Sequence, residues 1–585
     1  MAKIENKEIA KILYEIGGHL EIKGIQFKPR TYEKAGYSIE NLEEEVSEIY
    51  KKGGLKAVED IPGVGVSIAK KIEELIKTGH LKYYEKLKKF LPVKVGELSS
   101  VEGVGPKMIF KLYKKLKVKN INDLEKAAKA GKIAKIAGLG KKAEEKILKG
   151  IEFLRKSGGR FLLGSILPQV RLIENRLRNL KEIDRVAIAG SIRRMQETIG
   201  DLDILVTSKK PEKVMDFFIS MPEIAHVYSR GNTKTMVRLK DGMDADLRVV
   251  PDKSFGAALQ YFTGDKRHNI TLRVLAEKKK YKLNEYGLWR GKKLIAGRTE
   301  EEIYRALGMA TPPPEIRTDS GEIQAALRQA QGKPEGLPKL IGYGDVKGDL
   351  QVTTNWTDGE NSIEEMAVAA QEIGLGYIAI TDHTKSLAMT GGLDEKKLLK
   401  QMAAIDKLNS KFNPPAGGQK FRILKGAEVN ILKDGLLDIK DEVLARLDVV
   451  GIAVHSHFNL PREEQTKRIV KAMRNKNADI LFHPTGRLIQ KRGPYDVDVE
   501  EIIKTAKETG TVLEIDADPY RLDLKDEYIR KAIEAGVKLA IDSDAHSKNS
   551  FHYLEFGIAQ ARRGWATKND IINTRPWREM LKLLK

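Results

Sequence analysis

Three carboxylates in two short apolar runs are the residues of this sequence best suited to chemistry. Asp201 and Asp203 belong to the run 200–206, and Asp246 begins the run 246–250. Both runs are rich in residues of buried strands, where an ionised carboxylate is unfavourable unless a cation balances it. Asp201 and Asp203 are two positions apart, so a strand places them on one face. A third carboxylate from a neighbouring strand completes an oxygen cluster suited to Mg²⁺, and two such ions suit in-line phosphoryl transfer.

The segment just upstream could bind phosphates. Residues 186–189 form an apolar predicted strand that ends at Gly190 and Ser191, and Arg193 and Arg194 follow. The glycine lets backbone N–H groups approach a phosphate, the serine adds a hydroxyl donor, and the arginines offer forked donors. By itself this pattern is more often a surface turn with solvated arginines. Followed by Gly-Asp-x-Asp on the next predicted strand, it indicates a triphosphate site.

Composition bounds the size of the protein and its partners. A chain of 585 residues should hold several domains, and 41% hydrophobic residues are enough for globular cores. The formal net charge of +22 indicates a polyanionic partner, because each basic contact to a phosphate releases counterions. A solvated Lys- and Glu-rich surface of the thermophilic kind is the alternative, and both interpretations can hold together.

Two absences from the sequence also narrow its class. With zero cysteines the chain has neither disulfides nor thiolate zinc sites, so a metal must use histidine and carboxylate ligands. No apolar run is long enough to span a bilayer, and residues 1–5 do not begin a signal peptide. We therefore expect an intracellular protein, cytoplasmic and nucleoid-associated, that has no membrane partner and is a monomer.

A Gly-x-Gly pattern recurs in the first 150 residues, each time between two helical patterns. The glycines permit a tight turn, and the following helix presents free N–H groups to an anion. One such turn is weak evidence, because helices commonly end at glycine. Three in so basic a chain look like helix-hairpin-helix motifs, which bind the DNA backbone without reading its sequence. The third copy lacks a proline and is interpreted as mainly structural. The pairs are Gly63 and Gly65, Gly103 and Gly105, and Gly138 and Gly140.

Together these motifs resemble the nucleotidyltransferase superfamily and, within it, the family X DNA polymerases. The resemblance implies that Asp201 and Asp203 hold two Mg²⁺ ions. It implies that Asp246 holds the catalytic ion and helps to activate the primer 3′-hydroxyl. Asp244 competes with Asp246 for this role, and the family pattern favours Asp246. The segment 190–194 is implied to cradle the incoming triphosphate.

The resemblance continues to about residue 315. The Tyr-Phe-Thr-Gly turn at 261–264 is implied to pack under the sugar of the incoming nucleotide, where a bulky group would exclude a ribose 2′-hydroxyl. Taken alone, the two aromatic residues would be core residues. Asp265 stands where many family members have serine, and its role stays open. The implied nucleotide contacts are Tyr261, Phe262, Gly264 and Asn269, and the implied template and DNA contacts are Lys234 and Arg273.

The N-terminal region resembles the deoxyribose-phosphate lyase domain of polymerase beta-like proteins. Residue by residue, Lys71 falls on the lysine that attacks the sugar aldehyde to form a Schiff base. Lys28 and Tyr32 fall on other family positions that bind DNA, whereas Phe27 and Ser67 replace a phosphate-binding histidine and lysine. The alternative is that Lys71 belongs to a solvated helix face, because a nucleophilic lysine needs surroundings that lower its pKa.

From about residue 346, apolar strands alternate with helices, which predicts an α/β barrel. Six of the ten histidines fall in this part, mostly at strand ends, where such barrels hold their chemistry. This half resembles the polymerase and histidinol phosphatase (PHP) domain, a phosphoesterase fused to bacterial and archaeal family X polymerases. The implied metal ligands are Asp358, His383, Glu428, His455, His483, Asp544 and His546.

The first metal-binding motif of that domain is altered in this chain. Gln351 and Thr353 occupy the two positions of a His-x-His motif, and amide and hydroxyl groups are poorer transition-metal ligands than imidazole. We expect the remaining positions to hold one or two ions, either Mn²⁺ or Zn²⁺, with one site weakened. The expected activity is an impaired 3′–5′ exonuclease or phosphoesterase, or cleavage at abasic sites. The alternative is a structural remnant.

The sequence therefore predicts a DNA-directed DNA polymerase that fills short gaps during repair, with gapped or primer–template DNA and deoxynucleoside triphosphates as partners. The alternatives are a template-independent nucleotidyltransferase and a DNA-end-binding scaffold with a phosphoesterase barrel. The expected fold is multidomain: an all-α, lyase-like helix-hairpin-helix domain at 1–90, a fingers-type one at 91–155, an α/β palm at 156–255, a thumb at 256–315, a linker at 316–345 and a distorted β/α-barrel PHP domain at 346–585.

Overall fold

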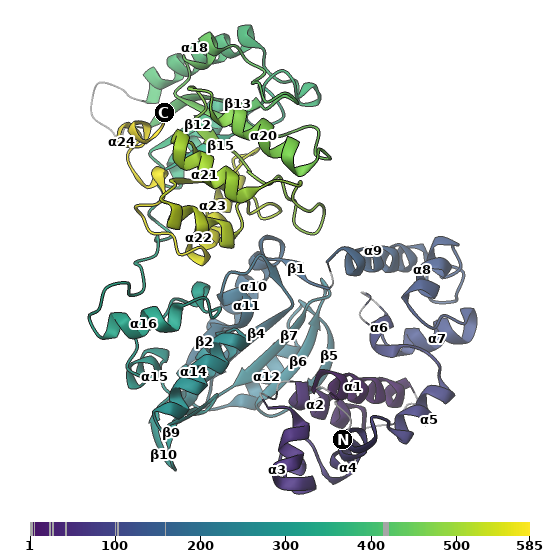
Figure 1. The fold of residues 1–585 in the computed structure, drawn as a ribbon. Coiled ribbons are helices and arrows are strands. Elements are labelled where there is room, and N and C mark those ends of the chain that lie inside the picture. The colour runs from purple at the N-terminus through teal and green to yellow at the C-terminus, as the bar shows by residue number, and fades with distance from the viewer. Residues whose placement is uncertain are drawn as a thin grey trace. The chain divides into compact units, whose positions relative to one another are not determined.

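The computed structural model describes most of the chain (Figure 1). The described residues are 4, 6–22, 25, 28–40, 42, 44–61, 63–99, 101, 104–157, 159–412 and 421–585. They form two compact units that alternate along the sequence: the first comprises residues 1–161, 177–186 and 200–250, and the second comprises residues 162–176, 187–199 and 251–585. No helix in these described ranges is long and apolar enough to cross a membrane.

The first unit begins with two helical clusters, each around its own apolar core. Amphipathic helices bury Leu13 and Ile72 in the first core and Ile109 and Leu124 in the second. The predicted all-α helix-hairpin-helix region is thus confirmed. The first cluster contains α1 (Asn6–Ile22), α2 (Lys28–Glu40), α3 (Val46–Glu59), α4 (Val66–Thr78) and α5 (Lys82–Phe90), and the second contains α6 (Val95–Ser99), α7 (Pro106–Leu116), α8 (Ile121–Lys129) and α9 (Lys141–Ser157).

A five-stranded mixed sheet follows, as the sequence predicted for the palm, and its strands belong to the first unit except for the end of β2. Its order is β2-β4-β7-β6-β5, with β4 and β7 parallel and the pairs β7–β6 and β6–β5 antiparallel. Helix α12 (Pro211–Ile219) packs on β5, β6 and β7 (Figure 1). The strands are β2 (Arg185–Ile188), β4 (Asp201–Thr207), β5 (Ile224–Arg230), β6 (Lys234–Leu239) and β7 (Asp244–Val249).

The central strands of this sheet have one apolar and one polar face. In β7, Ala245 and Leu247 are buried, whereas Asp246 on the other face is only partly buried. In β4, Leu202 is buried while Asp201 is exposed. The acidic residues therefore lie on the polar face of apolar strands, less deeply than the apolar runs alone suggested.

The second unit contains the predicted thumb around a small core that includes Leu272, Ile303 and Tyr304. Strands β8, β9 and β10 form an antiparallel sheet in the order β10-β9-β8. The elements are α10 (Leu163–Arg178, beginning in this unit), α11 (Gly190–Arg193), α13 (Phe255–Thr263), α14 (Lys266–Lys278), β8 (Lys282–Asn284), β9 (Gly287–Arg290), β10 (Lys293–Ala296), α15 (Glu300–Ala306) and α16 (Glu322–Ala330).

Part of the segment 316–345, which the proline-rich sequence predicted as a linker, is ordered against the thumb. Helix α16 buries Ile323 and Ala326 in the thumb core. The Arg317 guanidinium is fully buried and pairs with Glu300 at the start of α15. Pro and Gly correctly marked the turns here, but they did not reveal the apolar face of the helix between them.

The rest of the second unit is a seven-stranded parallel sheet whose strands run in chain order, with helices around it (Figure 1). A parallel bridge between Val352 and Ala545 links the first strand to the segment after the last, so the sheet is nearly closed into a barrel. The predicted β/α barrel is confirmed. The strands are β11 (Gly348–Val352), β12 (Tyr377–Ile380), β13 (Arg422–Asn430), β14 (Val449–Ala453), β15 (Ile480–Leu481), β16 (Val512–Asp516) and β17 (Leu539–Asp542).

Helices follow most of these strands and cover the barrel core, in which Ile423 and Ile452 are fully buried. Each parallel strand therefore ends at the same edge, where loops carry the histidines found in the sequence. The helices are α17 (Ile363–Glu372), α18 (Glu395–Phe412), α19 (Asp441–Leu444), α20 (Arg462–Met473), α21 (Val499–Thr509), α22 (Asp526–Ala535) and α23 (Leu554–Arg563).

Candidate functional sites

The palm sheet places the three predicted acids on two adjacent strands, β4 and β7. In the parallel register of β4 and β7, Asp203 is opposite Asp246, and Asp201 is opposite Asp244. Burial, with further contributions from Asp201 and Asp246, raises the pKa of Asp203 to about 8. Arg248 and Lys234 oppose this rise without cancelling it. Among the described residues, the ligand atoms of the three acids do not all lie within 4.8 Å of one another, but carboxylates on one face of two adjacent strands offer the oxygen ligands that Mg²⁺ prefers.

Two basic residues pair with Asp246 in the structure. The Nζ of Lys234 lies 3.2 Å from Asp246 Oδ2, and a guanidinium nitrogen of Arg248 lies 3.4 Å from the same oxygen. Burial lowers the pKa of Lys234 to about 7, with Arg248 adding to the effect and Asp246 opposing it. Asp244 instead pairs with Arg238 at 2.8 Å. The sequence pattern indicated Lys234 as a DNA contact but not its pairing with Asp246.

The predicted phosphate cradle lies at the start of α11 in the second unit. Gly190 has a φ of 64°, which favours glycine, and Ser191 follows it in the helix. The Arg193 guanidinium donates to Thr263 Oγ1 at 2.7 Å and to the two Glu300 carboxylate oxygens at 2.9 and 2.6 Å. Arg194 donates to the Thr263 carbonyl oxygen. Both arginines therefore connect α11 to the end of α13.

Glu300 is a residue of this region that the sequence did not reveal. It is buried, and although burial favours its neutral form, Arg317 and Arg193 lower its pKa to about 2. The carboxylate is thus ionised and occupies two guanidinium nitrogens of Arg193. In this arrangement Glu300 orients Arg193, and a phosphate must share that guanidinium with it.

The Tyr-Phe-Thr-Gly turn closes α13 and is held by the next helix. The rings of Tyr261 and Phe262 meet edge to face at 5.0 Å, and Asn269 donates from Nδ2 to the Tyr261 carbonyl oxygen at 2.7 Å. A Cβ at Gly264 would collide with the Asn269 side chain, so this position requires glycine. Asp265, whose role was open, accepts from the His268 amide and caps the N-terminus of α14.

Arg273 lies in the middle of α14, in the same unit as the turn. Its side chain is partly buried, and this burial lowers the pKa of the guanidinium, with Glu277 and Glu285 opposing the effect. A guanidinium remains charged under these conditions, so the position can serve the DNA contact that the sequence predicts.

The candidate lyase residues lie together in the first helical cluster. The Lys71 Nζ is 5.8 Å from the Tyr32 ring centroid and 5.1 Å from that of Tyr83, and it donates to the Ser67 hydroxyl at 3.0 Å. Burial and then Lys28 lower the pKa of Lys71. Tyr83, which stacks with Tyr32, was missed from the sequence because no motif marked it.

Two of the predicted DNA-binding glycines begin helices. Gly65 is the N-cap of α4 and Gly105 the N-cap of α7, both with extended backbone at φ −86° and −84°. A Cβ at either position would meet nothing within 4 Å, so the fold itself does not demand glycine there. Gly63 has a φ of 85°, which does favour glycine. Gly103 lies outside the described residues.

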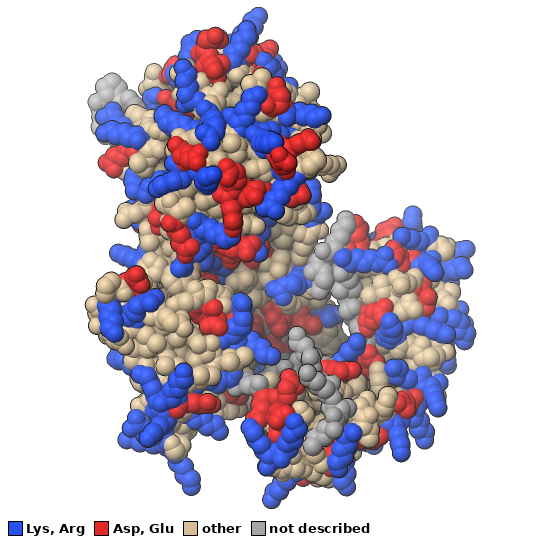
Figure 2. Space-filling view, viewed as in Figure 1, with Lys and Arg blue, Asp and Glu red and all other residues tan. Residues whose placement is uncertain are grey.

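Basic side chains are abundant around these helices. Figure 2 shows lysine and arginine over much of the visible face of the helical clusters, interspersed with acidic residues. Among them, Lys70 and Lys77 in α4 and Lys114 and Lys115 in α7 are exposed. This mixture of charges is compatible with both interpretations of the sequence, a surface that binds a polyanion and a solvated surface rich in lysine and glutamate.

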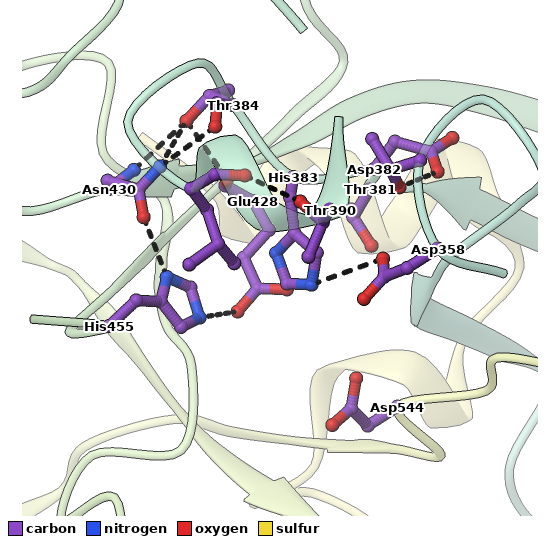
Figure 3. Close-up of polar contacts among 12 residues, drawn as sticks. Asp358, Thr381, Asp382, His383, Thr384, Thr390, Glu428, Asn430, His455 and Asp544 are labelled. Carbon is purple, nitrogen blue, oxygen red and sulfur yellow. Dashed lines mark hydrogen bonds and ion pairs between the residues drawn. The ribbon is translucent and has the colours of Figure 1, made fainter. Parts of the chain in front are cut away.

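The barrel gathers five of its seven predicted ligands into two groups. Ligand atoms of His383, Glu428 and His455 lie within 4.8 Å of one another, and so do those of Asp358, His383 and His546. Figure 3 shows His383 between Glu428 and Asp358. Imidazole and carboxylate donors at this spacing fit a transition-metal ion.

The two remaining predicted ligands have other partners among the described residues. His483 contacts Glu428 Oε1 with its Nε2 at 2.8 Å, and so it borders the first group. Asp544 Oδ1 lies 3.7 Å from His546 Nδ1 in the second group, and Asp544 Oδ2 lies 3.5 Å from the Nε of Arg521. Gln351 and Thr353 are fully buried in and just after β11.

Supporting residues behind the histidines were not predicted from the sequence. His455 Nδ1 contacts Asn430 Oδ1 at 2.8 Å, and Asn430 in turn donates to Thr384 and Asp438. Asp382 accepts from Thr354 and Gln401. Such partners orient ligand rings. Polar residues next to predicted ligands at strand ends were the only signal available for them.

Comparisons with known proteins agree with this geometry. Residues 4–81 match the helix-hairpin-helix domain, residues 95–152 the SAM-like helix-hairpin-helix tandem, and residues 258–318 the DNA polymerase beta thumb. Over 587 aligned residues, covering 100% of both chains, the sequence is 36% identical to the DNA polymerase/3′-5′ exonuclease PolX of Bacillus subtilis (strain 168). A probable phosphatase of Thermoanaerobacter sp. (strain X514) is 30% identical over 37% of this chain and 84% of its own.

The open space around Gly65 and Gly105 generates a prediction. The double variant Gly65→Ala/Gly105→Ala should fold, with a loss of at most ~1 kcal/mol from each helix cap. Its methyl groups should keep DNA phosphates from the helix N-termini, and we expect the Kd for duplex DNA to rise at least about tenfold, since each hydrogen bond to a charged group contributes ~1.5–3 kcal/mol. Fluorescence anisotropy measures the Kd, and thermal melting checks the fold.

The matched control is Gly140→Ala in the third copy, which also has open space around it. This variant should retain wild-type DNA affinity if the third copy is structural. Unchanged affinity in a folded double variant would contradict the role assigned to the first two turns.

Proposed function

We propose that this chain, which belongs to the PolX family of DNA polymerases, is a DNA-directed DNA polymerase and 3′–5′ exonuclease that fills short gaps during repair. The observation that carries the proposal is the register of β4 and β7, which sets Asp203 opposite Asp246 in a cluster that the protein's own cations leave under-balanced. The full-length similarity to the Bacillus subtilis polymerase supports the same conclusion. Gapped or primer–template DNA and deoxynucleoside triphosphates are the proposed substrates.

In this proposal Asp201, Asp203 and Asp246 hold Mg²⁺. When bound, the ions would activate the primer 3′-hydroxyl and stabilise the pyrophosphate leaving group. Gly190 and Ser191 at the start of α11 offer N–H and hydroxyl donors to the triphosphate. Arg193, oriented by Glu300, supplies a fixed positive charge to it.

The turn at the end of α13 would select the sugar. Asn269 donates to the Tyr261 carbonyl oxygen and so restrains the backbone of this turn, to which we assign the position beneath the incoming nucleotide. Arg194 adds a second restraint through the Thr263 carbonyl oxygen. Template contacts are assigned to Lys234 and Arg273. The match of residues 258–318 to a polymerase thumb favours this interpretation over a template-independent transferase or a binding scaffold.

The polymerase proposal predicts different outcomes for neighbouring acids. Asp203→Asn and Asp246→Asn should each reduce nucleotide incorporation by at least about 10³-fold, because several kcal/mol of charge stabilisation at the reacting phosphate are lost. Primer extension on gapped DNA measures this, and DNA affinity should persist. Asp244→Asn is the matched control: it neutralises the Arg238-paired carboxylate on the same strand and should retain activity. Equal losses in all three variants would contradict the assignment.

We assign the exonuclease to the barrel. His383, Glu428 and His455 would hold one ion, either Mn²⁺ or Zn²⁺, and Asp358 and His546 offer further ligands beside them. A neutral imidazole donates a lone pair from only one nitrogen, so His383 would serve one of the two groups at a time. An ion held there would supply a nucleophilic hydroxide near neutral pH. His483 and Asn430 position these ligands through their contacts with Glu428 and His455. The similarity to a probable phosphatase over 37% of this chain, the size of one domain, supports this assignment.

Metal loading of the barrel is the test of this assignment. Glu428→Gln removes the charge shared by three histidines, so 3′-end degradation with Mn²⁺ should fall at least about 10²-fold while primer extension stays intact. Removal of metal by EDTA and back-titration with Mn²⁺ should restore only the wild type. His552→Ala, an exposed histidine of the same domain, is the control. Degradation that survives in Glu428→Gln would place the nuclease elsewhere.

A lyase activity is favoured by the surroundings of Lys71. Because its pKa is lowered, more of the amine is neutral at a given pH, and the neutral amine is the nucleophile. The amine would attack C1′ of the sugar aldehyde at a 5′-deoxyribose phosphate. Lys28 contributes to the lowered pKa by repulsion between like charges.

Borohydride trapping on DNA with a 5′-deoxyribose phosphate tests the lyase. Lys71→Ala should abolish the trapped adduct, and Lys70→Ala, its exposed neighbour, should not. Trapping should rise with pH and level off below the ordinary lysine value of 10.5, and Lys28→Ala should shift that rise to higher pH. A pH profile unchanged by Lys28→Ala would contradict the proposed activation.

A further inference from the structure

An arginine enters the barrel mouth beside one of the predicted metal ligands. Arg521 lies in the segment after β16, and its Nε is 3.4 Å from Asp516 Oδ2 and 3.5 Å from Asp544 Oδ2. The side chain of Arg521 is 21% exposed, whereas those of Asp516 and Asp544 are 0% and 6% exposed. The guanidinium thus bridges two buried carboxylates from neighbouring strand ends.

The strand next to Asp544 carries the two substituted ligand positions. Val352 bridges to Ala545, and the Ala545 amide donates to the Gln351 carbonyl oxygen at 3.3 Å, so Gln351 and Thr353 adjoin the segment of Asp544. Both side chains are fully buried. Within the described residues, neither the Gln351 amide nor the Thr353 hydroxyl has a hydrogen-bond partner.

These uncharged groups cannot compensate for the acids around them. Glu514 and Asp516 on β16 and Asp542 on β17 are fully buried, and Asp516 is opposite Asp542 in the parallel register. Among these acids, the Arg521 guanidinium lies beside Asp516 and Asp544. Because a guanidinium is always charged in proteins, Arg521 is a permanent cation at this place.

Both groups of His and acidic metal-ligand type among the described residues contain His383, and neither contains Asp544, although His546 of the second group has its Nδ1 3.7 Å from Asp544 Oδ1. The residues of the Asp544 side do not fit a transition-metal ion, because they offer an amide, a hydroxyl and a carboxylate that is already paired. The residues of the His383 side do fit one.

We propose that the Arg521 guanidinium takes the place of a metal ion on the Asp544 side of the barrel, so that divalent ions bind only on the His383 side. The number of bound ions does not depend on the proposed exonuclease function; only the catalytic role of those ions rests on it. A guanidinium binds phosphate oxygens through forked donors, but it cannot lower the pKa of a bound water as a metal does. Chemistry that needs a metal-bound water is therefore confined to the His383 side.

Counting bound Mn²⁺ tests the proposal independently of activity. All variants carry Asp201→Asn, Asp203→Asn and Asp246→Asn, which remove the palm sites, and each is dialysed against micromolar Mn²⁺ and analysed by mass spectrometry for metal per chain. The first variant is Asp544→Asn, which should leave the metal count unchanged. The second is Gln351→His/Thr353→His, which should also leave it unchanged because Arg521 still occupies the site.

The decisive variant adds Arg521→Met to the two histidines, and we expect it to bind one additional ion. Arg474→Met, which removes a surface arginine paired with Glu508, is the control for the loss of a positive charge and should gain no ion. Far-ultraviolet circular dichroism establishes that each variant is folded.

Three results would overturn the proposal. One is the loss of an ion in Asp544→Asn, which would make Asp544 a ligand. Another is the gain of an ion by the two histidines while Arg521 is present. The third is a folded Arg521→Met/Gln351→His/Thr353→His variant without an additional ion. Should that variant not fold, Asp544→Asn and the histidine pair still decide the question. A barrel that fails to degrade DNA would contradict the exonuclease and leave these counts valid.

Discussion

Carboxylates gathered at the ends of neighbouring strands are the constraint on which both candidate sites depend. Parallel strands place residues of equal register side by side, so acids from separate segments meet at close range. Like charges in a poorly solvated place raise one another's pKa until a cation arrives. Asp203 in the palm and Asp516 in the barrel both show this effect. The two sites differ in the cation that balances the acids: a divalent metal ion is proposed for the palm, and Arg521 pairs with Asp516 in the barrel.

The second unit uses the same principle for structure. Glu300 is buried between Arg193 and Arg317, and this triad connects α11, α15 and the chain that leads to α16. Breaking a buried pair of this kind typically costs ~3–5 kcal/mol, because one charge is left unbalanced. A residue proposed to contact the nucleotide is therefore also part of the framework of the thumb, and its geometry is fixed before any ligand binds.

The sequence predicted local features well and long-range partners poorly. The spacing of Asp201 and Asp203 and the alternation of strands and helices after residue 346 depend on periodicity, which the structure reproduces. The partner of Arg193 lies more than one hundred positions away, and no local pattern marks it. Arg521 was missed because its partner strand was not recognised as acidic. Residues Leu513–Asp516 alternate apolar and acidic side chains, as 201–206 begins to do, but only the earlier run was interpreted chemically. The prolines near residue 313 led to the prediction of a linker where α16 forms. Turn residues indicate where elements end, but they do not indicate whether a helix between them has an apolar face.

The pairing of Lys234 with Asp246 sets an internal cation in competition with any external cation for the same carboxylate oxygen. In the structure the ammonium neutralises an oxygen that a divalent ion would need, so the two cations compete for one ligand. An ion that bound Asp246 as proposed would displace the lysine from that oxygen, and the ammonium would then be available to a different anion. On this proposal, metal binding to the sheet and the release of a positive group for nucleic acid are coupled.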